Sequence, residues 1–561
     1  MLPKINTNRN YLSAIGKTKN IELLSSKRLA NNGTFSKAIV DRNDRSELAF
    51  IPTFDESDFH HGGNKRVESS HFLPMLRLLN ASATAITDDD LKELANNRGL
   101  HKVVLEDCHN LIDVSSLSYI STLEEIHLRG CSKVSSIGGI GRLPMLWLLD
   151  LSQTAVTAND LKGLRESRSL VKIRLDDCKN LNAVNCLSCI TSVEEIYIRG
   201  CKNVKHIGSL GLLSTLHTLD VSKMPITNKG LLGIGASCGL ERIFLGDCKL
   251  LSNVSTLSSI RTLREISLSG CVRLESVGVL GVLPSLCVLD VSKTSLTDEG
   301  LDGLSVNNSL RKIILDDCVR LTNVSELSFI KSLKEIYLTG CISISGVGVL
   351  GVLPSLCVLD VSKTSLTDEG LDGLSVNRSL EKIILDDCAR LTNVSELSSI
   401  ISLRDVRLRG CNKMTGISCL GSLPELHSLD LSMTAVTSRS LSGLGVSLSL
   451  SKIFLEDCWN LTSVHTLFSI LTLEEIYLRG CIRVTDVGVL GTLPVLCLLD
   501  VSKTSVTDEG LDGLSASPTL KRILLEDCTR ITTLAALASI HTISEVNVCG
   551  CSGVKSFLST P

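Results

Sequence analysis

A strict 70-residue period constrains this chain more than any other feature. Prolines recur on that grid, with Ser214 in the one missing slot: Pro74, Pro144, Pro284, Pro354, Pro424 and Pro494. Two cysteine columns keep the same period: Cys108, Cys178, Cys248, Cys318, Cys388, Cys458 and Cys528, and Cys131, Cys201, Cys271, Cys341, Cys411, Cys481 and Cys551. Residues 277–307 reappear unchanged as 347–377, so duplication built the array. Such a chain folds by stacking one small unit many times.

Each of the seven super-repeats divides into three shorter units. In the second, LWLLDLSQT starts at Leu146, LVKIRLDDC at Leu170 and VEEIYIRGC at Val193. The next super-repeat starts at Leu216, which gives spacings of 24, 23 and 23 residues. All three units fit L-x-x-L-x-L-x-x-[C/T], the core of a leucine-rich repeat. We count about 21 units and predict a leucine-rich-repeat solenoid over residues 73–561.

Side-chain alternation assigns a face to each position of the unit. The fourth and sixth positions point into the core, and the third, fifth and seventh face solvent. Parallel stacking of such strands buries a continuous core. The first unit continues as TSLTDEGLDGL, where Thr297 can cap a short helix beginning with Asp298 and Glu299; the other units predict turns or short 3₁₀ segments. The predicted class is α/β, with a curved parallel sheet on the concave face and short helices and turns on the convex face.

Residues 1–72 do not repeat, and we expect either an amino-terminal cap or a partly disordered tail. The first 20 residues contain no apolar stretch of the kind found in a secretory signal. An excess of basic residues before residue 40 gives a weaker alternative, a mitochondrial presequence. The carboxyl end shows no obvious polar cap after the last strand. We expect a cytoplasmic protein.

Charge and hydropathy narrow the classes of partner. The net charge is −3 and the pI about 6.4, so no global basic field exists and nucleic acid is not the expected partner. The most apolar stretches are interrupted, as by Pro284 and Asp290, and recur periodically. Membrane-spanning helices lack such interruptions, so direct membrane insertion is not expected.

The cysteines and histidines predict no cofactor or metal. The two cysteine columns occupy the repeat position usually held by Asn, Cys or Thr under each turn, where a thiol is a small buried group. Cys186 and Cys189 form a lone CxxC without the second pair that zinc requires. His60, His61 and His71 have no supporting ligands nearby.

No catalytic motif passes its spacing test. Gly16-Lys17-Thr18 resembles the end of a phosphate-binding loop, but Tyr11 stands where that loop needs glycine. No Ser/His/Asp or Cys/His arrangement appears that the repeat itself does not explain. The sequence therefore predicts a protein that is not an enzyme.

Charges on the outward positions form a lattice. At the third position, second units carry a base and third units an acid: Lys102, Lys172, Arg242, Lys312, Lys382, Lys452 and Arg522 beside Glu125, Glu195, Glu265, Glu335, Asp405, Glu475 and Glu545. At the seventh position, Glu456 is expected to face Arg479 on the adjacent strand. Exposed pairs contribute about 0–1 kcal/mol each. We interpret the lattice as a device for strand register and solubility, with partner binding as the alternative.

The candidate binding site is the outward fifth position. Second units place Val104, Arg174, Phe244, Ile314, Ile384, Phe454 and Leu524 there, and third units add Tyr197, Tyr337, Arg407 and Tyr477. First units place an acidic row there: Asp150, Asp220, Asp290, Asp360, Asp430 and Asp500. Apolar and aromatic groups rimmed by charge are typical of protein-binding surfaces. The predicted stripe is Phe244, Ile314, Ile384, Phe454, Leu524, Tyr197, Tyr337, Tyr477, Asp290 and Asp360; the alternative is scattered exposure without function.

The repeat wording also carries a family resemblance. LTNVSELSSI and VTDVGVLGTLPVLCLLDVSKT resemble the leucine-rich-repeat proteins of kinetoplastid flagellates, among them the expression-site-associated proteins named as regulators of adenylate cyclase. Those relatives also carry an amino-terminal RING-type zinc module. This chain has no cysteine before Cys108, so the module and its activity are not carried over.

Three functions follow from these observations. We favour a non-catalytic intracellular scaffold that binds a protein or peptide on its concave face. The resemblance implies a regulator of a membrane adenylate cyclase. Repeats of this style also resemble those attached to F-box modules, which implies a substrate receptor for a ubiquitin ligase, although residues 1–72 show no clear F-box pattern.

Overall fold

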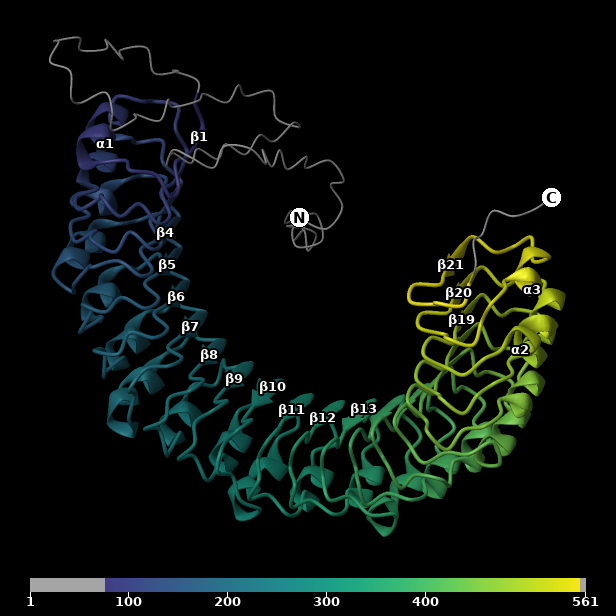
Figure 1. Ribbon diagram of the computed structural model, residues 1–561. Helices are drawn as coiled ribbons and strands as arrows, with labels where there is room; N and C mark the ends of the chain where they lie inside the picture. Colours follow the sequence, from purple (N-terminus) through teal and green to yellow (C-terminus); the bar gives the residue numbers. More distant parts are fainter. Residues whose placement is uncertain (1–75, 555–561) are drawn as a thin grey trace, which may run out of the picture. The chain divides into compact units, whose positions relative to one another are not determined.

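The computed structural model describes residues 76–554. These residues form two compact units, one ending at Cys178 and one beginning at Lys179. The non-repeating segment 1–72 and the last residues of the chain lie outside the described residues, so the cap and tail predictions for them remain predictions. Figure 1 shows the described residues as coloured ribbons.

Unit 1 contains five three-residue strands. They are β1 (Leu78–Asn80), β2 (Lys102–Val104), β3 (Glu125–His127), β4 (Leu148–Asp150) and β5 (Lys172–Arg174). Each strand pairs in parallel with the next, and equivalent positions of the repeat lie opposite one another, as Lys102 does with Glu125.

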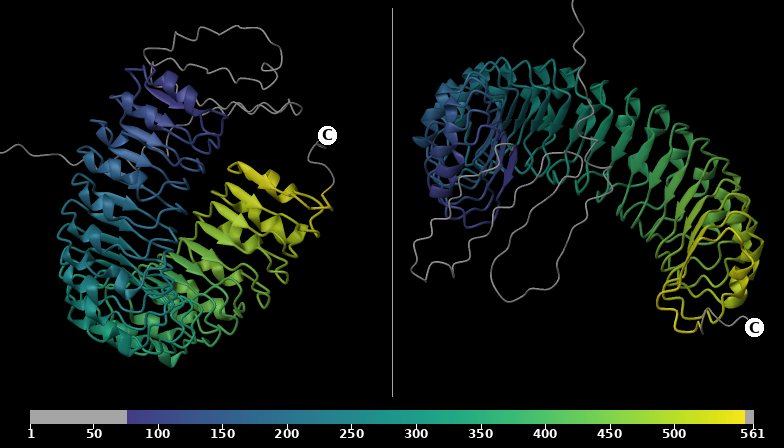
Figure 2. Two further views of the ribbon diagram at one scale, coloured as in Figure 1. Left: turned by 90° about the vertical axis from the view of Figure 1, so that its left-hand side faces the viewer. Right: turned by 90° about the horizontal axis from the view of Figure 1, so that it is seen from above.

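Unit 2 contains sixteen strands of the same length. They are β6 (Glu195–Tyr197), β7 (Thr218–Asp220), β8 (Arg242–Phe244), β9 (Glu265–Ser267), β10 (Val288–Asp290), β11 (Lys312–Ile314), β12 (Glu335–Tyr337), β13 (Val358–Asp360), β14 (Lys382–Ile384), β15 (Asp405–Arg407), β16 (Ser428–Asp430), β17 (Lys452–Phe454), β18 (Glu475–Tyr477), β19 (Leu498–Asp500), β20 (Arg522–Leu524) and β21 (Glu545–Asn547). Consecutive strands again pair in parallel and in register. Within this unit the strands line the concave side and the helices the convex side (Figures 1 and 2), which confirms the predicted fold class.

The convex layer is mostly 3₁₀ helix. Unit 1 has α1 (Asp88–Leu94), η3 (Ser115–Tyr119), η4 (Ile140–Arg142) and η5 (Asp160–Glu166). Unit 2 has η6 (Asn185–Cys189), η7 (Gly208–Leu212), η8 (Asn228–Leu231), η9 (Ile234–Ala236), η10 (Ser255–Ser259), η11 (Gly278–Val282), η12 (Glu299–Leu301), η13 (Leu304–Val306), η14 (Ser325–Phe329), η15 (Gly348–Val352), η16 (Glu369–Leu371), η17 (Leu374–Val376), η18 (Ser395–Ser399), η19 (Ser418–Ser422), η20 (Ser440–Val446), η21 (His465–Ser469), η22 (Gly488–Thr492), η23 (Asp512–Ala516), α2 (Asp508–Leu511) and α3 (Ala535–Ala538). In residues 76–554 no helix is both long and apolar enough to cross a bilayer.

The short helix after β10 forms as its capping residue predicts. The Thr297 hydroxyl accepts a hydrogen bond from the backbone N–H of Gly300 at 3.2 Å, which satisfies one free donor at the helix start. The element is one 3₁₀ turn, and Gly303 follows it with φ of 93°, a left-handed conformation that glycine adopts without steric cost.

Strand alternation sorts the core from the surface. In β11 the middle residue, Ile313, is fully buried, while Lys312 and Ile314 on either side are half-buried. The sixth-position residue, Leu315, is also fully buried. Because each strand repeats this pattern, stacking joins the inward side chains of one unit into a continuous core.

Candidate functional site

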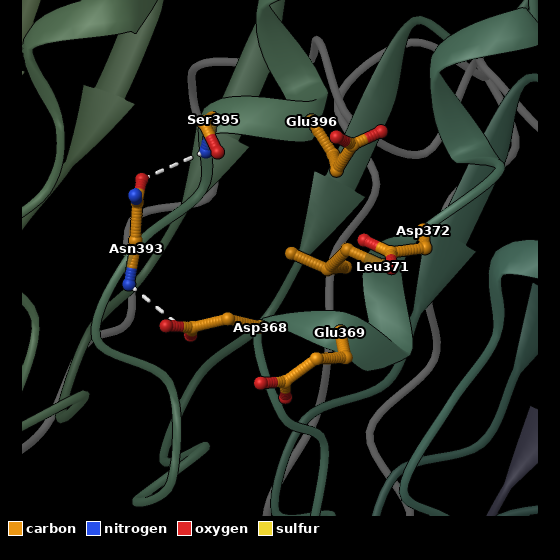
Figure 3. A pocket seen from close by; sticks show the side chains of 7 residues that line it. All are labelled: Asp368, Glu369, Leu371, Asp372, Asn393, Ser395 and Glu396. Atoms are coloured by element: carbon orange, nitrogen blue, oxygen red, sulfur yellow. Dashed lines mark hydrogen bonds between the residues drawn. The ribbon is translucent and has the colours of Figure 1, made fainter.

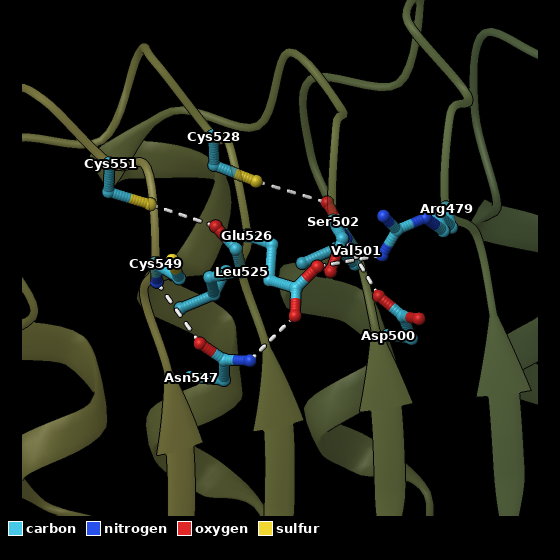
Figure 4. Close-up of polar contacts among 10 residues, drawn as sticks. All are labelled: Arg479, Asp500, Val501, Ser502, Leu525, Glu526, Cys528, Asn547, Cys549 and Cys551. Carbon is cyan, nitrogen blue, oxygen red and sulfur yellow. Dashed lines mark hydrogen bonds and ion pairs between the residues drawn. The ribbon is translucent and has the colours of Figure 1, made fainter. Parts of the chain in front are cut away.

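The two cysteine columns belong to the core. The thiol of Cys318 donates to the carbonyl oxygen of Val291 at 3.3 Å, and the thiol of Cys341 donates to that of Leu315 at 3.1 Å. Figure 4 shows the same contacts for Cys528 and Cys551. Burial raises the pKa of the Cys341 thiol to about 12, which keeps it protonated and unreactive. These hydrogen bonds therefore tie the turn after each strand to the preceding repeat.

The remaining candidate ligands do not assemble. Cys189 is exposed and Cys186 half-buried, both on η6. Within residues 76–554, no three His, Cys, Asp or Glu side chains are placed to hold a metal ion. The three amino-terminal histidines lie outside the described residues.

The apolar and aromatic fifth-position side chains point away from the core, as predicted, but they are half-buried rather than freely exposed. Arg407 is exposed, and Asp150 and Asp500 of the acidic row are buried. They cover one another laterally. The rings of Phe454 and Tyr477 stack with centroids 4.6 Å apart and an interplanar angle of 9°. The ammonium of Lys312 lies 4.6 Å from the centroid of the Tyr337 ring. The structure thus orders this row of side chains along the sheet.

Each ordered tyrosine is also held through its hydroxyl. Tyr337 donates to Glu335 at 3.0 Å, and Tyr477 donates to Glu475 at 2.9 Å. Burial, and then the neighbouring Glu475, raise the pKa of Tyr477 to about 12. The third-position glutamate therefore holds the fifth-position tyrosine ring in one orientation.

The acidic row has a structural role that the sequence analysis missed. Asp290 accepts the backbone N–H of Ser292 at 3.1 Å, and Asp360 accepts that of Ser362 at 3.0 Å. The same bond recurs at Asp150, Asp220, Asp430 and Asp500. These carboxylates therefore stabilise the turn after each first-unit strand. The recurring D-x-S at positions five to seven was the available signal.

Five of the predicted ion pairs at the third position are present in the described residues. The closest N···O distances are 2.6 Å for Lys102–Glu125, 2.9 Å for Lys312–Glu335, 2.7 Å for Lys382–Asp405, 2.8 Å for Lys452–Glu475 and 2.7 Å for Arg522–Glu545. Arg242 differs, because its Nε donates to the hydroxyl of Thr218 on the preceding strand at 3.1 Å. The lattice therefore joins the second repeat of a super-repeat to the third repeat, as the strand register predicts.

The predicted ion pair between Glu456 and Arg479 at the seventh position was wrong. Arg479 does not pair with Glu456 on the adjacent strand; it reaches over β19 to Glu526, at 2.9 Å (Figure 4). Arg409 likewise reaches over β16 to Glu456, at 3.2 Å. An arginine side chain is long enough to cross the small serine of the intervening repeat, which is Ser432 in one pair and Ser502 in the other. These ion pairs therefore link strands that are not hydrogen-bonded neighbours.

A hollow on the helical side of unit 2 is acidic but small. It measures about 150 Å³ and is lined by Asp368, Glu369, Leu371, Asp372, Asn393, Ser395 and Glu396 (Figure 3). The Asp368 carboxylate accepts the backbone N–H groups of Thr392 and Asn393 at 2.8 and 3.2 Å. Burial opposes the shift, but hydrogen bonds from the Thr392 hydroxyl and from these N–H groups lower the pKa of Asp368 and give the carboxylate a capping role. The hollow shows no nucleophile–base arrangement.

Comparison with known proteins agrees with this architecture. No family model matches the chain. A Trypanosoma equiperdum protein named "Putative adenylate cyclase regulatory protein" is 26% identical over 186 residues, 32% of this chain and 30% of that protein. An Arabidopsis thaliana protein named "Putative disease resistance protein" is 25% identical over 322 residues, 56% of this chain and 25% of that protein. The chain thus spans less than a third of the length of these curated relatives.

A solved structure supports the fold alone. The TLR13 chain of the TLR13–ssRNA13 complex aligns with a TM-score of 0.56 and 18% identity, covering 85% of this chain and 78% of that one. At that identity the likeness concerns architecture, not ligand. The repeat pattern, the parallel sheets with short convex helices and this alignment agree: the chain is a leucine-rich-repeat protein.

Proposed function

We propose that this protein is a non-catalytic scaffold that binds a protein or peptide on the concave strand face of unit 2. The observation that carries the proposal is the fifth-position row of half-buried aromatic and aliphatic side chains, from Tyr197 to Leu524, which point away from the core. A leucine-rich-repeat core is complete without them. Their apolar surface is available for a partner.

The row is also arranged for binding. The Phe454–Tyr477 stack and the Tyr–Glu hydrogen bonds hold the rings before any partner arrives. Interface hot spots favour aromatic side chains in such ordered settings. The predicted site residues Asp290 and Asp360 lie in the same row and add negative charge beside the rings, besides stabilising their turns.

The identity of the partner is a narrower question. The Trypanosoma similarity favours a membrane adenylate cyclase, although it covers only part of both proteins. A substrate receptor in ubiquitination is the other narrow form of the proposal, and both use the same concave face. We also propose that the protein is located in the cytoplasm.

The test is affinity purification with cross-linking from a kinetoplastid lysate, followed by mass spectrometry. The wild-type chain and the Phe244→Ser, Phe454→Ser double variant serve as baits, and Val376→Ser, which changes an exposed convex residue (57%), is the matched control. We expect the wild type and the control to enrich the same partner and the double variant to lose it. Equal enrichment by all three would move the site away from the concave row. A cyclase, or ligase components, among the enriched proteins would decide between the narrow forms.

A further inference from the structure

Two seventh-position carboxylates of unit 2 lack the arginine that their counterparts have. Arg409 pairs with Glu456 and Arg479 pairs with Glu526, in each case 47 residues further along the chain. In the two preceding super-repeats the arginine is replaced by Ser269 and Thr339. The carboxylates left without it are Asp316 and Asp386.

Neither carboxylate forms an ion pair in the part of the chain that the structure describes, although Arg407 and Arg409 lie near Asp386. Asp316 accepts the backbone N–H of Thr339 at 2.9 Å, and Asp386 accepts that of Arg409 at 3.0 Å, but neither forms an ion pair. Burial, with Asp360 among the neighbouring acids, raises the pKa of Asp316. Burial and the neighbouring acids raise that of Asp386 to about 6, although Arg407 opposes the shift. By contrast, Arg479 lowers the pKa of its partner Glu526.

The surroundings share this negative charge. From β7 to β14, the fifth and seventh positions hold five carboxylates and no basic side chain: Asp220, Asp290, Asp316, Asp360 and Asp386. The third position there is largely balanced by pairs such as Lys312–Glu335 and Lys382–Asp405. At the eighth position lysines alternate with aspartates: Lys223, Asp247, Lys293, Asp317, Lys363 and Asp387. The excess acid therefore lies along the two middle columns of the strand face.

Apolar side chains lie within the same area. Ile314 on β11 pairs in register with Tyr337 on β12, and Ile384 lies on β14. All three are half-buried and point away from the core. A partner that contacts them would thus meet carboxylates on both sides of an apolar centre.

We propose that strands β10–β14 bind an extended basic segment of a partner protein, whose Lys or Arg side chains pair with Asp316 and Asp386. The apolar side chains of that segment contact Ile314, Tyr337 and Ile384. This inference rests on the proposed function and adds the chemistry of the partner to it. The partner supplies the cations that the repeat itself supplies at Arg409 and Arg479, in a setting where charge complementarity favours the correct partner.

The strand spacing sets a pattern for the partner. Asp316 and Asp386 lie three strands apart, which is roughly 14 Å at about 4.8 Å per strand. An extended chain that crosses the strands rises about 3.3 Å per residue. The two basic residues of the partner are therefore about four residues apart, with an apolar residue between them.

The test uses the full chain and two synthetic peptides. One carries lysines four residues apart with an isoleucine between them, in a serine and glycine background; the other has glutamates in place of the lysines. Fluorescence anisotropy measures binding at low and high salt. We expect the lysine peptide to bind at least about tenfold tighter and to weaken as salt rises. Equal binding, a preference for the glutamate peptide, or preferential binding of a single-stranded RNA control would overturn the proposal.

Matched variants locate the contact. Asp316→Asn with Asp386→Asn keeps an acceptor oxygen at each position for the N–H groups of Thr339 and Arg409 but removes the charge, and we expect a loss of about tenfold or more in affinity for the lysine peptide. The control is Glu456→Gln with Glu526→Gln, which changes the carboxylates that already have arginine partners. We expect little change in the control. An equal loss in both double variants would overturn the assignment to Asp316 and Asp386.

A third variant restores the arginine that this part of the repeat lacks. Thr339→Arg places a guanidinium where Arg409 stands one super-repeat later, within reach of Asp386. We expect weaker binding of the lysine peptide and an unchanged or higher melting temperature, so the loss is not a folding defect. If the lysine peptide fails while the Phe244→Ser, Phe454→Ser variant still loses its cellular partner, the charge assignment is wrong and the concave function stands. If both tests fail, both proposals fall.

Discussion

The guanidinium of Arg479 meets the carboxylate of Glu526 at 2.9 Å, although the two residues follow β18 and β20, which are not neighbouring strands. The intervening seventh-position residue is Ser502, whose small side chain is fully buried. Arg409 and Glu456 repeat the relationship across Ser432. Ion pairing on this face therefore depends on the residue between the partners as well as on the partners. Where Ser269 or Thr339 replaces the arginine, the corresponding carboxylate, Asp316 or Asp386, lacks this arginine partner.

Core and surface positions of one strand should respond differently to truncation. Leu315 is fully buried, so Leu315→Ala should lower the free energy of unfolding by about 2–5 kcal/mol. Ile314 points the other way and is half-buried, so Ile314→Ser should cost less than about 1 kcal/mol. Urea unfolding followed by circular dichroism measures both. A larger loss for Ile314→Ser than for Leu315→Ala would reverse the assignment of faces.

Most thiols of the cysteine columns should be chemically silent in the folded protein. Apart from the half-buried Cys551 they are buried, and burial raises the pKa of Cys248 and Cys341 to about 12. Cys108 and Cys458 differ, because a hydrogen bond with the neighbouring cysteine lowers their pKa. Brief alkylation with iodoacetamide at neutral pH, read by mass spectrometry, should label the exposed Cys189, Cys238 and Cys549 first. EDTA and reductant should leave the melting profile unchanged. Early labelling of Cys341 in folded protein would contradict the assignment of these thiols to the core.

The repeat made most of the fold predictable. A fixed period, an alternating strand pattern and the Thr297 cap each specify local structure, so the strands, the faces and the third-position pairs such as Lys312–Glu335 follow from the sequence. The seventh-position ion pairs could not be predicted in this way. Strand register identifies only residues on adjacent strands, whereas an arginine side chain can reach past its neighbour. The lateral packing that half-buries Ile314 is likewise a property of neighbouring side chains, which alternation does not describe.

The acidic row should tolerate loss of charge better than loss of its acceptor. Asp360 accepts hydrogen bonds from both the backbone N–H and the hydroxyl of Ser362. Asp360→Ala leaves these donors without that partner and should cost about 1–2 kcal/mol of stability. Asp360→Asn keeps an acceptor oxygen and should cost less. Thermal melts of the two variants compare them, and equal losses would show that charge, rather than the turn hydrogen bonds, determines stability at this position.

The pH dependence of stability should reveal the carboxylate that lacks its arginine. The pKa of Asp386 is raised to about 6 by burial and neighbouring acids, whereas an unfolded aspartate titrates near 3.9. Above pH 6 the group is charged in both states, and the folded state bears the unfavourable charge. As the pH falls through 6, the folded state takes up the proton first, so the contribution to stability rises and is complete below about pH 4.

Asp386→Asn should therefore stabilise the protein at pH 7 to 8 by about 1 kcal/mol, after allowance for solvent screening, because the amide removes the charge and keeps the acceptor for the Arg409 N–H. The gain should shrink through about pH 6 and vanish by about pH 4. Glu526→Gln is the control of opposite sign, since Arg479 lowers the pKa of Glu526; it should lower the melting temperature at neutral pH, and the loss should fade as the pH falls through the pKa of that carboxyl. Melting temperatures measured across this range in constant ionic strength compare the two. A loss of stability in Asp386→Asn at pH 7 would mean that the carboxylate already has a cation in the folded protein, and would remove the basis for assigning that place to a partner.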